Sequence, residues 1–271
     1  VEIEAKLGLL VDNQTGQRIR LPVTSLAVLE NPSANNSQPG GGSGGGRPTR
    51  PWYTFKSDMS LDQHRYFNEL LNRRARDTQS SQHRGAKVHY KHTREIDRFY
   101  LEPNPNAASQ PGEPDRFRIR ATFDKETAKV VEGPGAIIEK KKIANLDVYS
   151  PNTAMDFRIT VSEEKPMRMP TVESSHERHK DRLSYRHEIW QFDLTQVKTP
   201  SRENSNQQPS PFAPRGNDAP SVTHELELEL ANTDWFLKER QRFQDRDPGH
   251  QFNTIVQTFV NNIYMLASHA R

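Results

Sequence analysis

Glutamates at every second position form two groups near opposite ends of the sequence, and these residues are best suited to chemistry: Glu2, Glu4, Glu225, Glu227 and Glu229. Successive side chains of a β-strand point to opposite faces, so the carboxylates of each group share one face and the residues between them share the other. Clustered carboxylates without histidine or cysteine favour hard divalent cations such as Mg²⁺ or Mn²⁺. The pattern therefore predicts two acidic strands that can hold a metal ion.

Basic and polar residues repeat this alternation in other segments, opposite aliphatic or aromatic side chains. The alternating sets include Arg116, Arg118 and Arg120; Arg158, Thr160, Ser162 and Glu164; Arg178, Lys180 and Arg182; and Gln191, Asp193 and Thr195. A solvated outer face explains any one such strand, because it is the norm in antiparallel sheets. Like charges two residues apart repel, however, and the separation of acid from base onto different strands indicates faces that look at each other.

A closed barrel explains both the alternation along each strand and the separation of acidic from basic residues onto different strands. The charged faces then line a polar tunnel, and the aliphatic faces point outward and need helices to cover them. Buried charges must be neutralised, so we expect the carboxylates to be balanced by a divalent cation and by the arginines and lysines. Several cations facing one cavity favour a ligand with dense negative charge, and polyphosphate fits both halves of the tunnel. The sequence therefore predicts an α+β fold built on a closed antiparallel β-barrel.

Hydrophobic periodicity gives the elements that position these residues. Period-two alternation predicts strands at 1–7, 87–100, 116–123, 136–143, 157–161, 181–196 and 223–230. Helical spacing predicts one helix at 61–76 capped by Ser60, one at 235–243 beginning from Asn232 or Thr233, and a longer one starting at Pro248. In the longest helix we expect one apolar stripe, formed by Phe252, Ile255, Val256, Phe259 and Ile263.

Four segments rich in Pro, Ser, Gly or Asn interrupt these elements, at 31–50, 102–114, 165–175 and 199–221. Such compositions bury little apolar surface, so we expect flexible insertions in a single domain spanning 1–271. The glycine tract at 40–46 lacks the preceding strand and the following Lys-Ser/Thr of a phosphate-binding loop. The insertions account for an apolar content of only 32%.

Composition excludes several classes of protein. The chain of 271 residues has 38 Lys and Arg, 35 Asp and Glu, and no cysteine. Disulfide frameworks, zinc ribbons and thiolate nucleophiles are therefore excluded. No apolar run approaches the roughly 20 residues that span a bilayer, so we expect no membrane association. The ten histidines are scattered and show no spacing typical of metal ligands.

Four motifs in order along the chain resemble a known family. They are V-E-I-E-A-K-L-G at the start, I-I-E-K-K-K-I-A-N-L-D-V-Y-S-P in the middle, H-K-D-R-L-S-Y-R-H followed by F-D-L-T-Q-V, and H-E-L-E-L-E-L near the end. The sequence resembles the fungal type of RNA 5′-triphosphatase, the beta subunit of the mRNA capping enzyme, among the triphosphate tunnel metalloenzymes. The resemblance implies Mg²⁺- or Mn²⁺-dependent hydrolysis of the γ-phosphate of 5′-triphosphate RNA, leaving a 5′-diphosphate end.

The resemblance also implies roles for individual residues. Metal ligands would be Glu2, Glu4 and Glu229, supported by Glu225 and Glu227. Glu164 would lie near the attacking water, and Asp193 and Thr195 would form the tunnel D-x-T pair, although these two can equally brace the sheet. The implied phosphate-binding residues are Arg120, Lys140, Arg178, Lys180 and Arg182, with Arg118 competing for the role of Arg120. Gln191 departs from the family, which often has Arg there.

Two other functions remain open at this stage. A tunnel enzyme could hydrolyse nucleoside triphosphate, thiamine triphosphate or inorganic polyphosphate, because each presents phosphates to the same charges. A non-catalytic RNA-binding module would use the basic strands, but the aligned glutamates would oppose phosphate binding. If the protein acts in mRNA capping, the resemblance implies an RNA guanylyltransferase partner, a homodimer and a nuclear location. It also implies that the partner docks on a segment upstream of residue 1.

Overall fold

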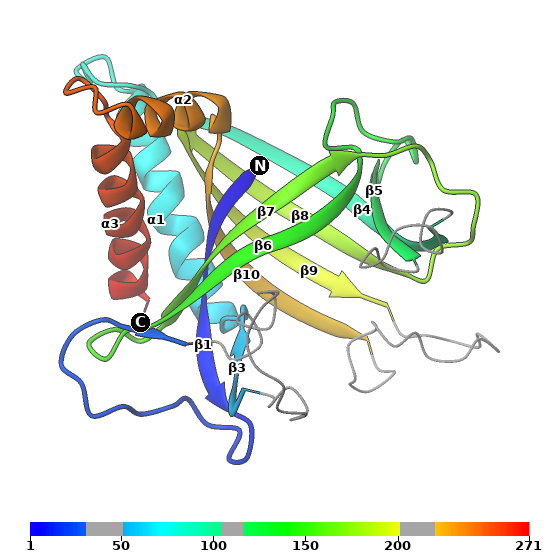
Figure 1. The fold of residues 1–271 in the computed structure, drawn as a ribbon, viewed down its shortest axis with the longest axis horizontal. Coiled ribbons are helices and arrows are strands. Elements are labelled where there is room, and N and C mark those ends of the chain that lie inside the picture. Colours follow the sequence, from blue (N-terminus) through cyan, green and yellow to red (C-terminus); the bar gives the residue numbers. More distant parts are fainter. Residues whose placement is uncertain (31–50, 105–115, 201–219, 271) are drawn as a thin grey trace.

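A computed structural model describes residues 1–30, 51–104, 116–200 and 220–270 (Figure 1). The expected insertion at 31–50 lies outside the described residues, as do 105–115 and 201–219. Four strands extend slightly into the ranges expected as insertions: β4 ends at Pro103, β7 ends at Pro166, β9 ends at Thr199 and β10 begins at Ser221.

Eight long strands close into an antiparallel barrel, which confirms the expected fold. The barrel strands are β1 Glu2–Asp12, β4 His89–Pro103, β5 Arg116–Asp124, β6 Ile137–Tyr149, β7 Asp156–Pro166, β8 His176–His187, β9 Trp190–Thr199 and β10 Ser221–Leu230. They follow the order β10-β9-β8-β4-β5-β6-β7-β1, and β1 pairs again with β10. Closure removes the free edges and leaves an inside and an outside face on every strand.

The alternation along each strand separates the two faces as expected. On β10, Leu226 and Leu228 are fully buried on the outside of the barrel, whereas Glu225, Glu227 and Glu229, which alternate with them, face the interior. Strand β1 brings its own carboxylates beside them, since Glu4 pairs with Glu229. Two segments more than 200 residues apart in the sequence thereby form one acidic surface.

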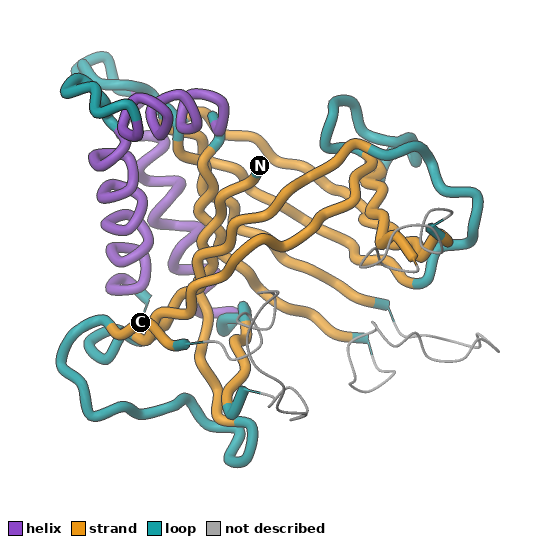
Figure 2. Tube along the Cα trace, viewed as in Figure 1, coloured by secondary structure: helices purple, strands orange, loops and turns teal. Residues whose placement is uncertain are grey.

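Three helices cover one side of the barrel (Figures 1 and 2): α1 Leu61–Gln79, α2 Thr233–Gln244 and α3 Phe252–His269. The main hydrophobic core lies between the outer face of the barrel and the helices, and it includes Phe67 of α1, Phe259 of α3 and Leu228 of β10. Ser60 caps α1 as expected, because its hydroxyl accepts a hydrogen bond from the backbone N–H of Gln63. The helices therefore bury aliphatic side chains on the outer faces of β1, β9 and β10.

Several sequence expectations need correction. The run 181–196 is not one strand, because β8 and β9 are joined by a tight turn in which Glu188 adopts a φ of 55°. Helix α3 begins at Phe252 rather than Pro248, since 248–250 form a turn in which Asp247 accepts a hydrogen bond from the N–H of Gly249. Val256 is 39% exposed and lies outside the buried stripe.

Two short strands were not predicted. Strand β2, Ala27–Leu29, pairs with β6, and β3, Tyr53–Lys56, pairs with β1. The segment expected as an insertion at 165–175 is packed in part, because Met167 and Val172 contact a hydrophobic cluster on the outside of β4 and β5. Its first two residues belong to β7.

In the described ranges, none of the helices combines the length and the apolar character that crossing a membrane requires.

Candidate active site

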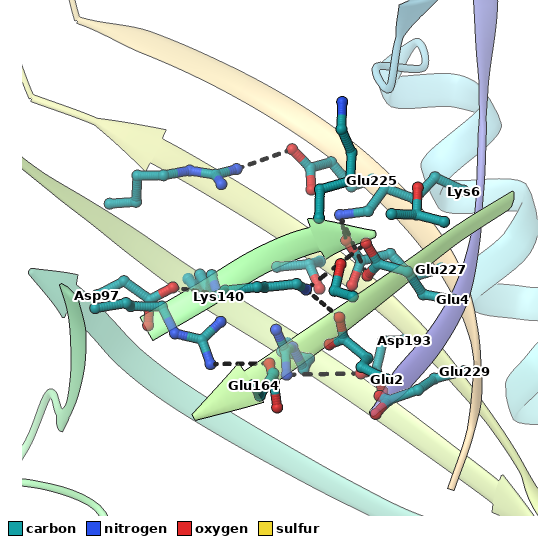
Figure 3. Close-up of a pocket in the computed structure, with 18 of the residues that line it drawn as sticks. Glu2, Glu4, Lys6, Asp97, Lys140, Glu164, Asp193, Glu225, Glu227 and Glu229 are labelled. Carbon is teal, nitrogen blue, oxygen red and sulfur yellow. Dashed lines mark hydrogen bonds and ion pairs between the residues drawn. The ribbon is translucent and has the colours of Figure 1, made fainter. Parts of the chain in front are cut away.

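A cavity of about 460 Å³ runs through the barrel interior (Figure 3). Eight carboxylates and eight cationic side chains line it, together with four other residues. All thirteen residues that the sequence proposed for the site are among them: Glu2, Glu4, Arg120, Lys140, Glu164, Arg178, Lys180, Arg182, Asp193, Thr195, Glu225, Glu227 and Glu229. The folded chain thus brings every proposed residue to one charged cavity.

Two lysines form ion pairs with glutamates on the acidic surface formed by β1 and β10. Lys140 from β6 pairs with Glu2 and lies 3.7 Å from Glu4. Lys6 donates a hydrogen bond of 2.5 Å to Glu227 and also lies 3.7 Å from Glu4. Burial would lower the pKa of Lys6, but Glu227 and Glu4 outweigh it and raise the pKa. Lys6 therefore stays charged inside the barrel.

Glu227 and Glu229 have opposite electrostatic environments although they are two residues apart. Burial would raise the pKa of Glu227, but Lys6 and Arg182 outweigh it and hold that pKa well below its usual range. At Glu229, burial and the nearby carboxylates of Asp193 and Glu2 raise the pKa to about 8. In the described part of the chain, Glu229 forms no hydrogen bond or ion pair. Arg182 acts in the opposite direction, but no positive side chain of the described ranges contacts this carboxylate.

The opposite wall of the cavity carries the arginines and lysines, most of which pair with a carboxylate. Lys180 of β8 pairs with Asp97 of β4, and Arg178 contacts Glu225 at 3.0 Å. The remaining distances are 3.6 Å between Arg182 and Asp193 and 3.8 Å between Arg120 and Glu164. Burial would raise the pKa of Asp97, but Lys180 and Arg120 hold it below its ordinary value. Several donors therefore converge on one space at the centre of the barrel.

The donor set suits a divalent metal ion. Glu2, Glu4 and Glu229 supply only carboxylate oxygens, which hard cations such as Mg²⁺ prefer. Burial and Glu227 together raise the pKa of Glu4 against the opposing effect of Lys6, so a bound cation would stabilise the charged form of this carboxylate. As the side chains stand, no three acidic or imidazole groups among the described residues lie close enough to coordinate a metal, because Glu2 and Glu4 are turned toward lysines. The chemistry of the donors fits the ion.

Asp193 and Thr195 lie on β9 between the acidic and the basic walls. Asp193 is only 1% exposed, and burial raises its pKa despite the nearby Arg182. Gln191 donates a hydrogen bond of 3.1 Å to Asp193. The buried hydroxyl of Thr195 has no hydrogen-bond partner in the described ranges. Gln191 thus contacts Asp193 without supplying a positive charge to it.

Sequence reasoning missed some of the cavity. Lys6 shares the parity of Glu2 and Glu4, so the alternation contained the signal that places it in the tunnel. Asp97 and Phe99 were not proposed, because the segment 87–100 carries charged residues on both of its faces. Their place in the cavity depends on β4 lying between β5 and β8.

A closed barrel whose interior balances carboxylates against arginines and lysines defines an enzyme of the triphosphate tunnel class. Comparisons with known proteins agree. Residues 1–271 match the model of the family described as mRNA capping enzyme, beta chain. The chain therefore belongs to this family, and its activity is that of an RNA 5′-triphosphatase in mRNA capping.

Individual relatives support the assignment. The mRNA-capping enzyme subunit beta of Schizosaccharomyces pombe is 33% identical over 271 residues, which cover 98% of this chain and 73% of that protein. The corresponding subunit of Cryptococcus neoformans var. neoformans is 30% identical, with coverage of 99% and 57%. The solved structure of S. pombe Pct1 RNA triphosphatase matches with a TM-score of 0.73 at 30% identity, covering 100% of this chain and 85% of that one. A second structure of Pct1, in complex with the Spt5 CTD, has the same TM-score at 29% identity and covers 100% of this chain and 86% of that one.

Proposed function

We propose that the tunnel hydrolyses the γ-phosphate of 5′-triphosphate RNA with Mg²⁺ or Mn²⁺, and that residues 1–271 form one catalytic domain. The observation that supports this most is the pairing of two walls in one cavity. One wall presents Glu2, Glu4 and Glu229, and the other presents arginines and lysines. A triphosphate bound with a divalent cation is complementary to both.

Each wall has a separate task. Arg120, Lys180 and Arg182 bind the phosphate oxygens, and their ion pairs with Glu164, Asp97 and Asp193 hold them in place before substrate arrives. Lys140 and Arg178 complete the phosphate site. Cations fixed in this way stabilise the charge that develops on the transferring phosphoryl group.

The acidic residues hold the metal and the water. Glu2, Glu4 and Glu229 would be the ligands, and Mg²⁺ or Mn²⁺ would supply positive charge that offsets the negative charge of the triphosphate. Glu227 keeps Lys6 in place and Glu225 keeps Arg178 in place, through the contacts described above. Glu164 orients the attacking water, while Asp193 and Thr195 position the basic wall. Water is the nucleophile, so no covalent intermediate is required.

The experiment that tests this function measures phosphate release from γ-labelled 5′-triphosphate RNA. We expect release with Mg²⁺ or Mn²⁺, none with chelator, and loss in a Glu2→Ala, Glu4→Ala double variant that remains folded. Release that persists in the folded double variant would contradict the metal site. A parallel assay with free ATP and with inorganic polyphosphate measures how far the tunnel accepts a triphosphate without RNA.

The family also suggests partners and location. We propose that the chain acts in the nucleus with an RNA guanylyltransferase, which uses the diphosphate end. We also propose a homodimer through α3. Helix α3 contains no Asp, Glu, Lys or Arg between Phe252 and His269, although Val256, Tyr264 and Met265 are exposed. A Tyr264→Lys variant that remains dimeric by light scattering would contradict this interface.

A further inference from the structure

The two ends of the tunnel differ in charge. Because neighbouring barrel strands are antiparallel, the order of residues along each strand shows toward which end each one lies. Glu2, Glu164, Asp193 and Glu229 lie toward one end, here called the acidic end. Phe99, Arg118, Lys142 and Arg178 lie toward the other, here called the basic mouth, together with Lys6 and Glu225.

Contacts between side chains agree with this placement. Arg178 forms its ion pair with Glu225, and Arg118 lies close enough to Arg178 to be affected by its charge. The guanidinium carbon of Arg118 lies 5.2 Å from the ring centre of Phe99. At the acidic end, Glu229 is affected by the charges of Asp193 and Glu2. The residues assigned to each end of the tunnel therefore lie close to one another.

Two cations at the basic mouth differ from the other six in the cavity. Lys6, Arg120, Lys140, Arg178, Lys180 and Arg182 each contact a carboxylate. Arg118 and Lys142 form no ion pair and no hydrogen bond within the described residues, and both are exposed. Each therefore offers an unneutralised positive charge at the entrance to the cavity, where a chain of phosphates would pass.

Phe99 limits the movement of Arg118. One face of the Phe99 ring stacks on the ring of His176 with centres 4.4 Å apart and planes 4° apart. Arg118 lies near the same ring, and a cation near an aromatic face is attracted by it. The guanidinium is therefore held at the mouth with its donors available to phosphate oxygens.

We propose that the RNA enters the tunnel through the basic mouth, where Arg118 and Lys142 bind the first internucleotide phosphate. This inference rests on the proposed function. In-line displacement requires the leaving diphosphate and the attacking water on opposite sides of the γ-phosphate. With the RNA at the basic mouth, the water side faces the acidic end, where Glu164 lies. Arg118 and Lys142 attract an internucleotide phosphate, which RNA has and a single nucleoside triphosphate lacks.

The test compares a short 5′-triphosphate RNA with free ATP in the wild type and in an Arg118→Ala, Lys142→Ala double variant. We expect KM for RNA to rise about 10- to 100-fold in the variant, with a much smaller rise for ATP, because each lost contact to phosphate costs roughly tenfold. RNA binding measured in chelator should also become less dependent on salt. The slope of log K for binding against log salt concentration should decrease in magnitude by about 1.4, because two contacts with a single strand are lost.

The matched control is Arg74→Ala, Lys141→Ala, which removes one arginine and one lysine from exposed positions that do not line the cavity. We expect both KM values to stay as in the wild type. Equal rises for RNA and ATP, or an RNA value that does not change, would overturn the proposed entrance. Wild-type phosphate release in the same assay shows that the proposed function stands independently, whereas its absence would refute the function itself.

Discussion

Replacing Glu229 with Gln should stabilise the metal-free protein, and increasingly so as the pH rises. Burial and neighbouring carboxylates raise the pKa of Glu229 from 4.5 to about 8. A carboxyl that binds its proton more tightly in the folded state contributes stability that is complete below its unfolded pKa and is lost as the pH rises through the folded one. Glutamine resembles the protonated acid and removes this loss.

The pKa of Glu229 sets the size of the effect. Each pKa unit is worth about 1.4 kcal/mol, so the shift corresponds to about 5 kcal/mol at most at pH 9 and to less than about 1 kcal/mol near pH 5. The assay is urea unfolding in chelator at several pH values, with Glu163→Gln as the control, because Glu163 is exposed on the outer face of β7. Stability curves for Glu229→Gln and wild type that run parallel across this range would refute the reasoning.

Other variants test the parts that support the site. Asp156→Asn should destabilise the protein by about 2–5 kcal/mol in urea unfolding, because the buried carboxylate accepts hydrogen bonds from two backbone amides and from Arg18; an unchanged midpoint would contradict this. Lys6→Met should destabilise by about 3–5 kcal/mol by leaving Glu227 unpaired, and adding Glu227→Gln should restore part of the loss; a double variant with additive losses would show that the pair is not coupled. Gly8→Ala should lower the melting temperature, because the added methyl group would collide with a carbonyl oxygen of β3; a stable alanine variant would refute the close approach.

The sequence predicted the tunnel because its signal is local. Alternation in T-H-E-L-E-L-E-L assigns each glutamate to a face without knowledge of neighbouring strands, and the same holds for Arg178, Lys180 and Arg182. Closure of the barrel then places the charged faces of these strands in the interior. For the same reason, the outer leucines correctly predicted a covering layer of helices.

Other features depend on pairing, which a single sequence does not display. Strands β2 and β3 have three and four residues, too few for alternation to be recognised. The turn between β8 and β9 contains Glu188 at positive φ instead of the glycine or asparagine that usually marks a hairpin, so the two strands were merged. The difference between the two tunnel ends likewise depends on which strands are neighbours.

The central claim is that the chemistry occurs on the inner face of the barrel. Glu163 and Glu164 are adjacent on β7, but Glu164 lines the cavity and Glu163 is exposed outside. The most direct test measures kcat/KM for phosphate release from 5′-triphosphate RNA in the Glu164→Gln and Glu163→Gln variants. The account predicts a loss of about 100-fold or more for Glu164→Gln and wild-type activity for Glu163→Gln. Equal activity of the two folded variants would contradict it.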